Sequence, residues 1–158
     1  MKSVDEERYV RFEFCVDDLN SAWRLLTAMA EVEANWVTYA AFKYALIEYA
    51  RPYTASYGLS IKKHPPLADS WVPRGYVALH EKIIDVRNQI LAHTDLGPRE
   101  PRLYIDSYAG KRSASIGQNV VSVEELYRKR QEIVSLIEGT LEALYAESEL
   151  RLNSLPKE

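Results

Sequence analysis

Apolar side chains recur at intervals of three and four residues over four stretches of the chain, and this spacing constrains the fold more than any other feature. It places the apolar residues on one face of an α-helix. The clearest stretch, residues 122–150, carries a stripe made of Val123, Leu126, Ile133, Ile137, Leu141 and Leu144. Similar stripes predict helices over residues 19–33, 36–57 and 75–95. Amphipathic helices bury their apolar faces against one another, so the sequence predicts a helical bundle.

Residues that disfavour helix separate these stretches. Pro52 is expected to kink the second helix, because proline lacks a backbone N–H and clashes with the preceding turn. Gly58 is a candidate cap for the end of that helix. Prolines predict a loop over residues 59–74, and the pattern of residues 98–121 predicts a small β-hairpin or an irregular insertion. The sequence Ser122-Val123-Glu124-Glu125 is typical of a capping box at the start of the last helix.

The N-terminal segment has a different period. Apolar and other side chains alternate over residues 9–16, which predicts a short half-buried strand. Asp17 and Asp18 then offer N-caps for the helix that follows. Taken together, the pattern predicts a mainly α fold: a four-to-five-helix bundle with a short N-terminal strand and a small β-hairpin before the last helix. The length of 158 residues suits a single domain over residues 1–158.

Composition narrows the function classes. A net charge of −3 argues against broad, nonspecific nucleic-acid binding, although it permits a local basic site. The single cysteine, Cys15, cannot form an intramolecular disulfide and fits a reducing compartment. We find neither a signal-peptide pattern nor an apolar run long enough to span a bilayer. The sequence therefore predicts a soluble, cytoplasmic protein without a membrane association.

One short segment concentrates groups that can act on a phosphate. Arg87 and Asn88 are followed by His93, Thr94 and Asp95 near the end of the third predicted helix. Histidine titrates near neutral pH, and the arginine guanidinium is a fixed fork of donors suited to phosphate oxygens. Arg87, Asn88 and His93 are therefore the candidate catalytic residues, with Asp95 as a candidate binding residue.

The helical positions of the two key side chains affect how they can cooperate. On an ideal helix Arg87 and His93 lie about 120° apart and flank Ile90. A joint site within one chain requires the helix end to fray, whereas a two-fold dimer can bring two such helices together. The alternative is that these residues have a structural role. A histidine at the end of an apolar stripe is often a core or helix-terminal residue, and Asp95 can pair with Arg87 or His93.

The segment Arg87-Asn88-(four residues)-His93 resembles the Arg-(four to six residues)-His motif of the HEPN superfamily. The ending Ala92-His93-Thr94-Asp95 is similar to that of several bacterial HEPN-like families, some of them linked to abortive infection. The resemblance covers about 20 residues of motif together with the order of the helices.

The resemblance implies a HEPN-like bundle that works as a homodimer through the third helix and cleaves RNA without a metal, often as a toxin or antiphage effector with an antitoxin partner. His93 would transfer the proton to or from the ribose 2′-hydroxyl or the leaving oxygen, and Arg87 would bind the scissile phosphate. Asn88 would orient the phosphate or the histidine. The alternative is a noncatalytic HEPN-like module that binds a partner protein or a nucleotide.

Other residues are weaker candidates. Arg51 and His80 are candidate binding residues, because either can lie near Arg87 in a bundle. The aromatic residues at helical spacing can form either a base-stacking platform or, as we expect, core: Tyr39, Phe42, Tyr49, Tyr53 and Tyr57. The histidines are too far apart in sequence for a typical local metal site. We therefore expect neither a metal nor a cofactor.

Overall fold

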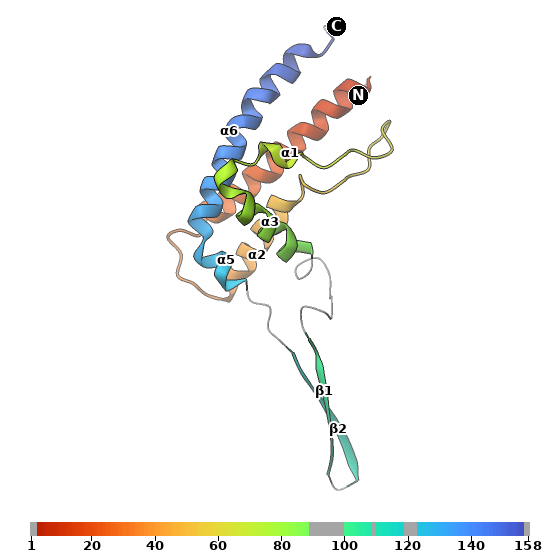
Figure 1. The fold of residues 1–158 in the computed structure, drawn as a ribbon, viewed down its shortest axis with the longest axis vertical. Helices are drawn as coiled ribbons and strands as arrows, with labels where there is room; N and C mark the ends of the chain where they lie inside the picture. The colour runs from red at the N-terminus through yellow and green to blue at the C-terminus, as the bar shows by residue number, and fades with distance from the viewer. Residues whose placement is uncertain (1–2, 89–99, 109, 119–122, 157–158) are drawn as a thin grey trace.

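The computed structural model describes residues 3–88, 100–108, 110–118 and 123–156. Its framework is three helices: α1 (Val4–Ala28), α2 (Trp36–Ala50) and α6 (Arg130–Ser154). Helix α1 packs against both α2 and α6. Figure 1 shows α1 and α6 side by side and antiparallel, so that the start of α1 and the end of α6 lie at the same end of the bundle. The predicted mainly helical bundle is confirmed.

The prediction of a strand over residues 9–16 is wrong, because these residues lie within α1. Ser3 caps this helix by accepting a hydrogen bond from the Glu6 backbone N–H at 3.1 Å. The buried positions follow a helical period, whereas Phe14 in the alternating pattern is 58% exposed. Asp17 and Asp18 consequently lie inside the helix and do not cap it.

The second predicted helix ends earlier than residue 57. Asn35 caps the start of α2, and Thr38 completes the capping box. The helix ends at Ala50 with Arg51 as its C-cap, so Pro52 follows the helix and does not kink it. Gly58 lies in the loop beyond and is not a cap of this helix.

The segment between α2 and the last helix contains short elements. Two single turns, η1 (Asp69–Trp71) and η2 (Arg74–Tyr76), lead into α3 (Val77–Val86), which packs on α2. Arg87 and Asn88 continue α3 with π-helical geometry. The remainder of the third predicted helix, including His93 and Asp95, lies outside the described residues. So does Ser122, the first residue of the proposed capping box.

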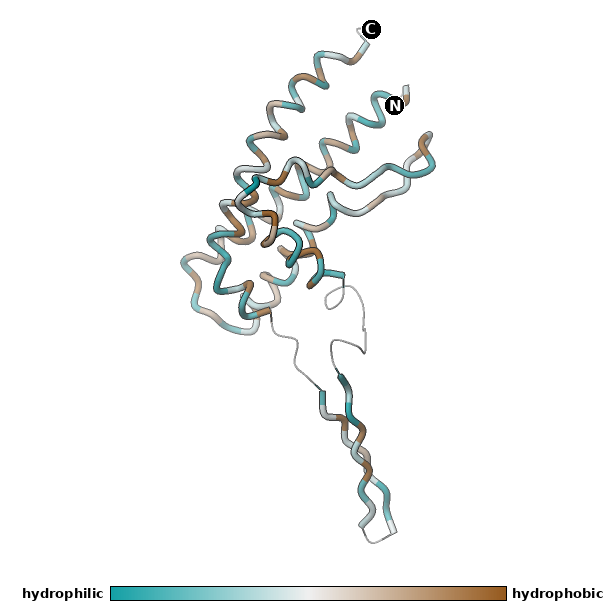
Figure 2. Tube along the Cα trace, viewed as in Figure 1, coloured by the Kyte–Doolittle hydropathy of each residue, from teal (hydrophilic) through white to brown (hydrophobic). Residues whose placement is uncertain are grey.

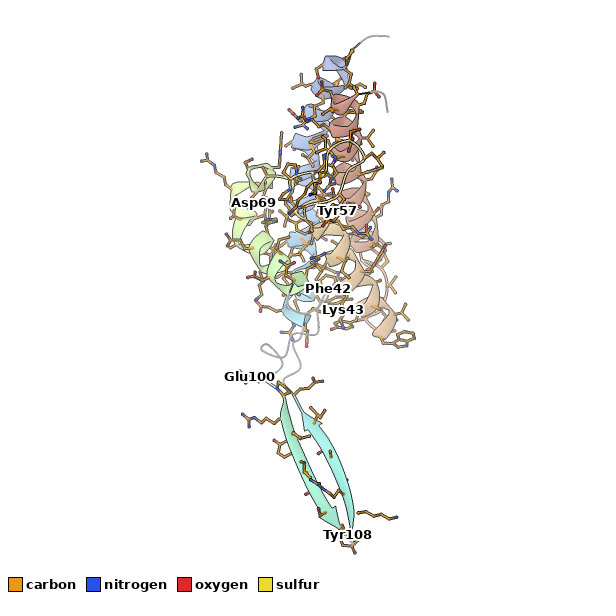
Figure 3. All side chains as sticks on the ribbon, turned by 90° about the vertical axis from the view of Figure 1, so that its right-hand side faces the viewer. Phe42, Lys43, Tyr57, Asp69, Glu100 and Tyr108 are labelled. Carbon is orange, nitrogen blue, oxygen red and sulfur yellow. The ribbon has the colours of Figure 1, made fainter. Side chains whose placement is uncertain are left out.

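The last predicted helix consists of two pieces, α5 (Glu124–Arg128) and α6, with Lys129 between them. An ion pair between Lys82 and Glu125 joins α3 to α5. The buried core lies where the helices meet and includes Phe42, which Figure 3 labels in the bundle. Its largest fully buried hydrophobic side chains come from α1, α2, α3, α5 and α6: Leu19, Leu26, Phe42, Leu46, Tyr49, Ile83, Leu126, Ile133, Leu136, Ile137 and Leu144.

The predicted hairpin is confirmed as β1 (Arg102–Tyr108) paired antiparallel with β2 (Lys111–Gly117). Gly110 in the turn has a φ of 76°, a left-handed conformation that glycine adopts without strain. The hairpin projects from the bundle, and Figure 3 places Tyr108 at its far end. Figure 2 shows hydrophobic residues along this hairpin as well as in the bundle. Leu103, Ile105 and Ile116 are all more than half exposed.

Candidate functional site

A cleft of about 650 Å³ lies between α1, the segment that follows α2, and the C-terminal end of α3. Arginines from these three parts of the chain line it: Arg11 from α1, Arg51 at the end of α2, and Arg87 at the end of α3. We call it the arginine cleft. Of the sequence-predicted site residues, the structure brings Arg51 and Arg87 together here.

Arg87 is half-buried and held by its neighbour. Its Nη1 donates a hydrogen bond to the Asn88 side-chain oxygen at 2.9 Å, and its Nε is buried with no hydrogen-bond partner. Asn88 itself is exposed. The described contact of Asn88 is therefore with the Arg87 guanidinium, which it helps to orient. The third catalytic candidate, His93, and the binding candidate Asp95 lie outside the described residues.

Arg51 has acidic neighbours that partly neutralise it. Its Nη1 lies 2.7 Å from Glu48 and 3.7 Å from Asp18, which also lines the cleft. Burial raises the pKa of the Asp18 carboxyl; Arg51 opposes that effect, Glu48 adds to it, and Arg11 opposes it further. Both guanidinium groups therefore favour the ionised form of the Asp18 carboxyl.

Arg11 is a cleft residue that the sequence analysis missed. Its Nη1 donates to the Cys15 sulfur at 2.8 Å and its Nη2 to the Thr54 carbonyl oxygen at 3.3 Å. Among the residues that the structure describes, neither Arg11 nor Arg87 forms an ion pair with a carboxylate. The available signal was helical spacing: Glu7, Arg11 and Asp18 recur at the three-and-four period that follows once residues 4–28 are read as one helix.

One wall of the cleft is a loop fastened to α1 by a buried pair. The Glu7 carboxylate accepts hydrogen bonds from the backbone N–H groups of Leu59, Ser60 and Ile61, at 2.7, 2.8 and 3.4 Å. His64 Nε2 lies 3.0 Å from the same carboxylate, and the His64 and Glu7 side chains are only 5% and 4% exposed. His64 is therefore committed to this buried pair.

The pKa of Glu7 reflects that environment. Burial by itself raises the pKa, but the hydrogen bonds from His64 and from the three backbone N–H groups outweigh burial and lower the pKa from 4.5 to about 2. Glu7 is thus a carboxylate at neutral pH. Because its lone pairs are already occupied by the loop, it is poorly suited to act as a general acid or base.

His80 does not line the arginine cleft. It is buried, with Nδ1 2.7 Å from the Tyr49 hydroxyl and Nε2 3.3 Å from Asp69. Burial lowers the pKa of His80, although Asp69 partly opposes this effect. The structure therefore places this binding candidate between the buried Tyr49 hydroxyl and the exposed Asp69 carboxylate, separate from the cleft that contains Arg51 and Arg87.

The aromatic stripe divides between core and surface. Phe42 and Tyr49 are buried, and Tyr39 and Tyr53 pack against the core, which confirms the expectation for these four. Tyr57 differs, because it is 87% exposed and lines the arginine cleft. Figure 3 shows it on the loop beside α1.

No group of three or more potential metal ligands occurs among the described residues. Within the same ranges, no helix combines the length and apolar character needed to cross a bilayer. Comparisons with protein-family models, with curated proteins and with solved structures find no match.

Proposed function

We propose that this protein is a metal-independent endoribonuclease of the HEPN type, acting as a cytoplasmic toxin or antiphage effector. The observation that carries the proposal is the position of Arg87. The arginine of the Arg87-Asn88-(four residues)-His93 motif lines a cleft together with two further arginines, in a chain whose net charge is −3. The described lining holds three arginines against two carboxylates, Glu7 and Asp18, and Glu7 is already hydrogen-bonded to the loop. Arg11 and Arg87, which form no ion pair among the described residues, therefore favour a phosphate-bearing ligand.

The chemistry follows from the substrate's own nucleophile. The ribose 2′-oxygen attacks the adjacent phosphorus, the bond to the 5′-oxygen of the next nucleotide breaks, and a 2′,3′-cyclic phosphate and a free 5′-hydroxyl result. In our proposal His93 transfers the proton between these oxygens. Arg87 stabilises the charge that develops on the phosphate oxygens, and Asn88 holds the Arg87 guanidinium in position.

A homodimer is part of the proposal. On an ideal helix Arg87 and His93 point about 120° apart, so a two-fold axis beside α3 would let one chain complete the site of the other. A specific antitoxin protein is the partner expected of such an effector.

The first test is to incubate the purified protein with total cellular RNA and excess EDTA, and to map the new RNA ends. Wild type should cleave and leave cyclic-phosphate ends. Arg87→Ala should lower the rate by about 100-fold to 1,000-fold, as for loss of one preorganised donor, and His93→Ala should abolish cleavage. Arg74→Ala, at the exposed start of the same helical segment, is the matched control.

Intact RNA with all of these proteins, folded and dimeric, would contradict the ribonuclease proposal. The motif would then be better explained as a dimer contact or as part of a binding module.

A further inference from the structure

Unsatisfied polar atoms gather at the arginine cleft. Five buried side-chain nitrogen or oxygen atoms in the described residues have no hydrogen-bond partner, and three of them belong to residues that line this cleft. These three are Arg11 Nε, Arg87 Nε and Ser56 Oγ. A buried donor without a partner carries a desolvation cost, so such a concentration in one place calls for a ligand that supplies acceptors.

The described lining carries three arginines against two carboxylates, Glu7 and Asp18, and the arginines without an ion pair favour an anion. Arg51 has Glu48 and Asp18 as neighbours, but Arg11 and Arg87 form no ion pair among the described residues. A phosphate group has several acceptor oxygens and can bind two guanidinium groups at once. To reach such an oxygen through its buried Nε–H, each guanidinium would turn away from its present partners, which are Cys15 and Thr54 for Arg11 and Asn88 for Arg87.

Two aromatic rings add a second recognition element. Phe14 is 58% exposed and Tyr57 is 87% exposed, and both line the same cleft. Exposed aromatic faces next to arginines are the combination by which proteins hold unpaired nucleobases. The cleft volume, about 650 Å³, lies in the range of sites that hold small ligands.

We propose that the arginine cleft binds one nucleotide, with the phosphate between Arg11 and Arg87 and the base against Phe14 and Tyr57. The Arg87–His93 motif does not predict a role in binding for Arg11, Phe14 or Tyr57. The nucleotide is either free or one unit of a single-stranded RNA. A role in positioning RNA for cleavage rests on the proposed function, whereas nucleotide binding itself does not.

Calorimetric titration of the catalytically blocked His93→Ala variant with adenosine 5′-monophosphate tests the site. The phosphate and the base should both contribute, so adenosine alone and inorganic phosphate alone should each bind at least about tenfold more weakly. Competition with a pentaadenylate oligoribonucleotide identifies the source: tighter binding of the oligonucleotide indicates an RNA strand, and tighter binding of the monophosphate indicates a free nucleotide.

Matched variants locate the site. Arg11→Gln should weaken binding of the monophosphate about tenfold or more, whereas Arg8→Gln, one turn earlier on α1 and outside this cleft, should not. Tyr57→Ala should weaken binding of the monophosphate about fivefold or more, whereas Tyr108→Ala, with the same exposed fraction of 87%, should not. Arg11→Lys keeps the charge and most of the stem, and so separates loss of the guanidinium fork from misfolding.

Failure of the monophosphate and the oligonucleotide to bind, or equal effects of Arg11→Gln and Arg8→Gln, would overturn the nucleotide site. This result is independent of the cleavage assay. Binding that depends on Arg11 and Tyr57 without any RNA cleavage would support the nucleotide site and contradict the ribonuclease proposal.

Discussion

At the scale of single residues, a carboxylate and a histidine that resemble an acid–base pair are used to hold a loop. Glu7 receives three backbone N–H groups in addition to His64, and both side chains are almost fully buried. Arg11 and Arg87, which line the same cleft, each keep a buried Nε–H without a hydrogen-bond partner. The arginine cleft is thus better equipped to bind an anion than to exchange protons through Glu7 or His64.

The lowered pKa of Glu7 gives stability a defined acid dependence. A group whose pKa is lower in the folded chain stabilises the fold fully above its unfolded value of 4.5, and this contribution is lost as the pH falls toward about 2. Glu7→Gln should therefore lower the free energy of unfolding at pH 7 and flatten its dependence between pH 4.5 and 2. Urea unfolding followed by circular dichroism at pH 7, 4.5 and 3 measures both effects.

Asp5→Asn is the control, because Asp5 also lies in the first turn of α1 and its ion pair with Arg8 is exposed. The loop-fastening role of Glu7 is wrong if Glu7→Gln and wild type lose stability in parallel over that pH range.

The fastened loop leaves no space at Gly58. A Cβ there would lie 2.2 Å from Glu7 Oε1, 2.3 Å from the Ile61 carbonyl oxygen and 2.5 Å from His64 Nε2. Gly58→Ala should destabilise the protein by about 1–3 kcal/mol, as expected for overpacking of a tight site. Gly75→Ala, where a Cβ meets nothing within 4 Å, should change stability by less than about 0.5 kcal/mol. Equal melting temperatures for the two variants would show that the loop shifts to make room for the added Cβ.

At the scale of elements, helical periodicity predicted the bundle but misplaced its ends. The alternation over residues 9–16 also fits a helix with a broad buried face, since Phe12, Cys15 and Val16 are buried there. The competing period-two pattern included Phe14, which is exposed in the cleft. Phe14, an apolar residue exposed at the candidate binding surface, thus produced the alternation that is typical of a strand.

The hairpin and the bundle should respond differently to loss of apolar side chains. Ile137 is fully buried in α6, so Ile137→Ala should cost about 2–5 kcal/mol of unfolding free energy. Ile105 is 53% exposed on β1, so Ile105→Ala should cost less than about 0.5 kcal/mol. Denaturant unfolding of the two variants compares them, and a large loss for Ile105→Ala would mean that the hairpin is stabilised by contact with another surface.

At the scale of the whole molecule, only part of the site was predictable from sequence. The motif singled out Arg87, and bundle geometry made Arg51 a reasonable neighbour. Arg11 and Tyr57 reach the cleft because α1 lies beside α2 and because Glu7 draws the loop onto it. Such contacts join residues far apart in the chain. Helical spacing can place Arg11 on one face of α1, but it does not show which other segments that face meets. The position of His80 away from the cleft was not predictable for the same reason: its partners, Tyr49 and Asp69, come from other elements.

The arginine cleft exists only when the N-terminal helix, the central loop and the end of α3 have all assembled. Any ligand that occupies it consequently binds the native state and has no counterpart site in the unfolded chain. By thermodynamic linkage, each tenfold excess of such a ligand over its dissociation constant adds about 1.4 kcal/mol to the free energy of unfolding. Ligand binding in the cleft and folding of the chain are therefore linked equilibria.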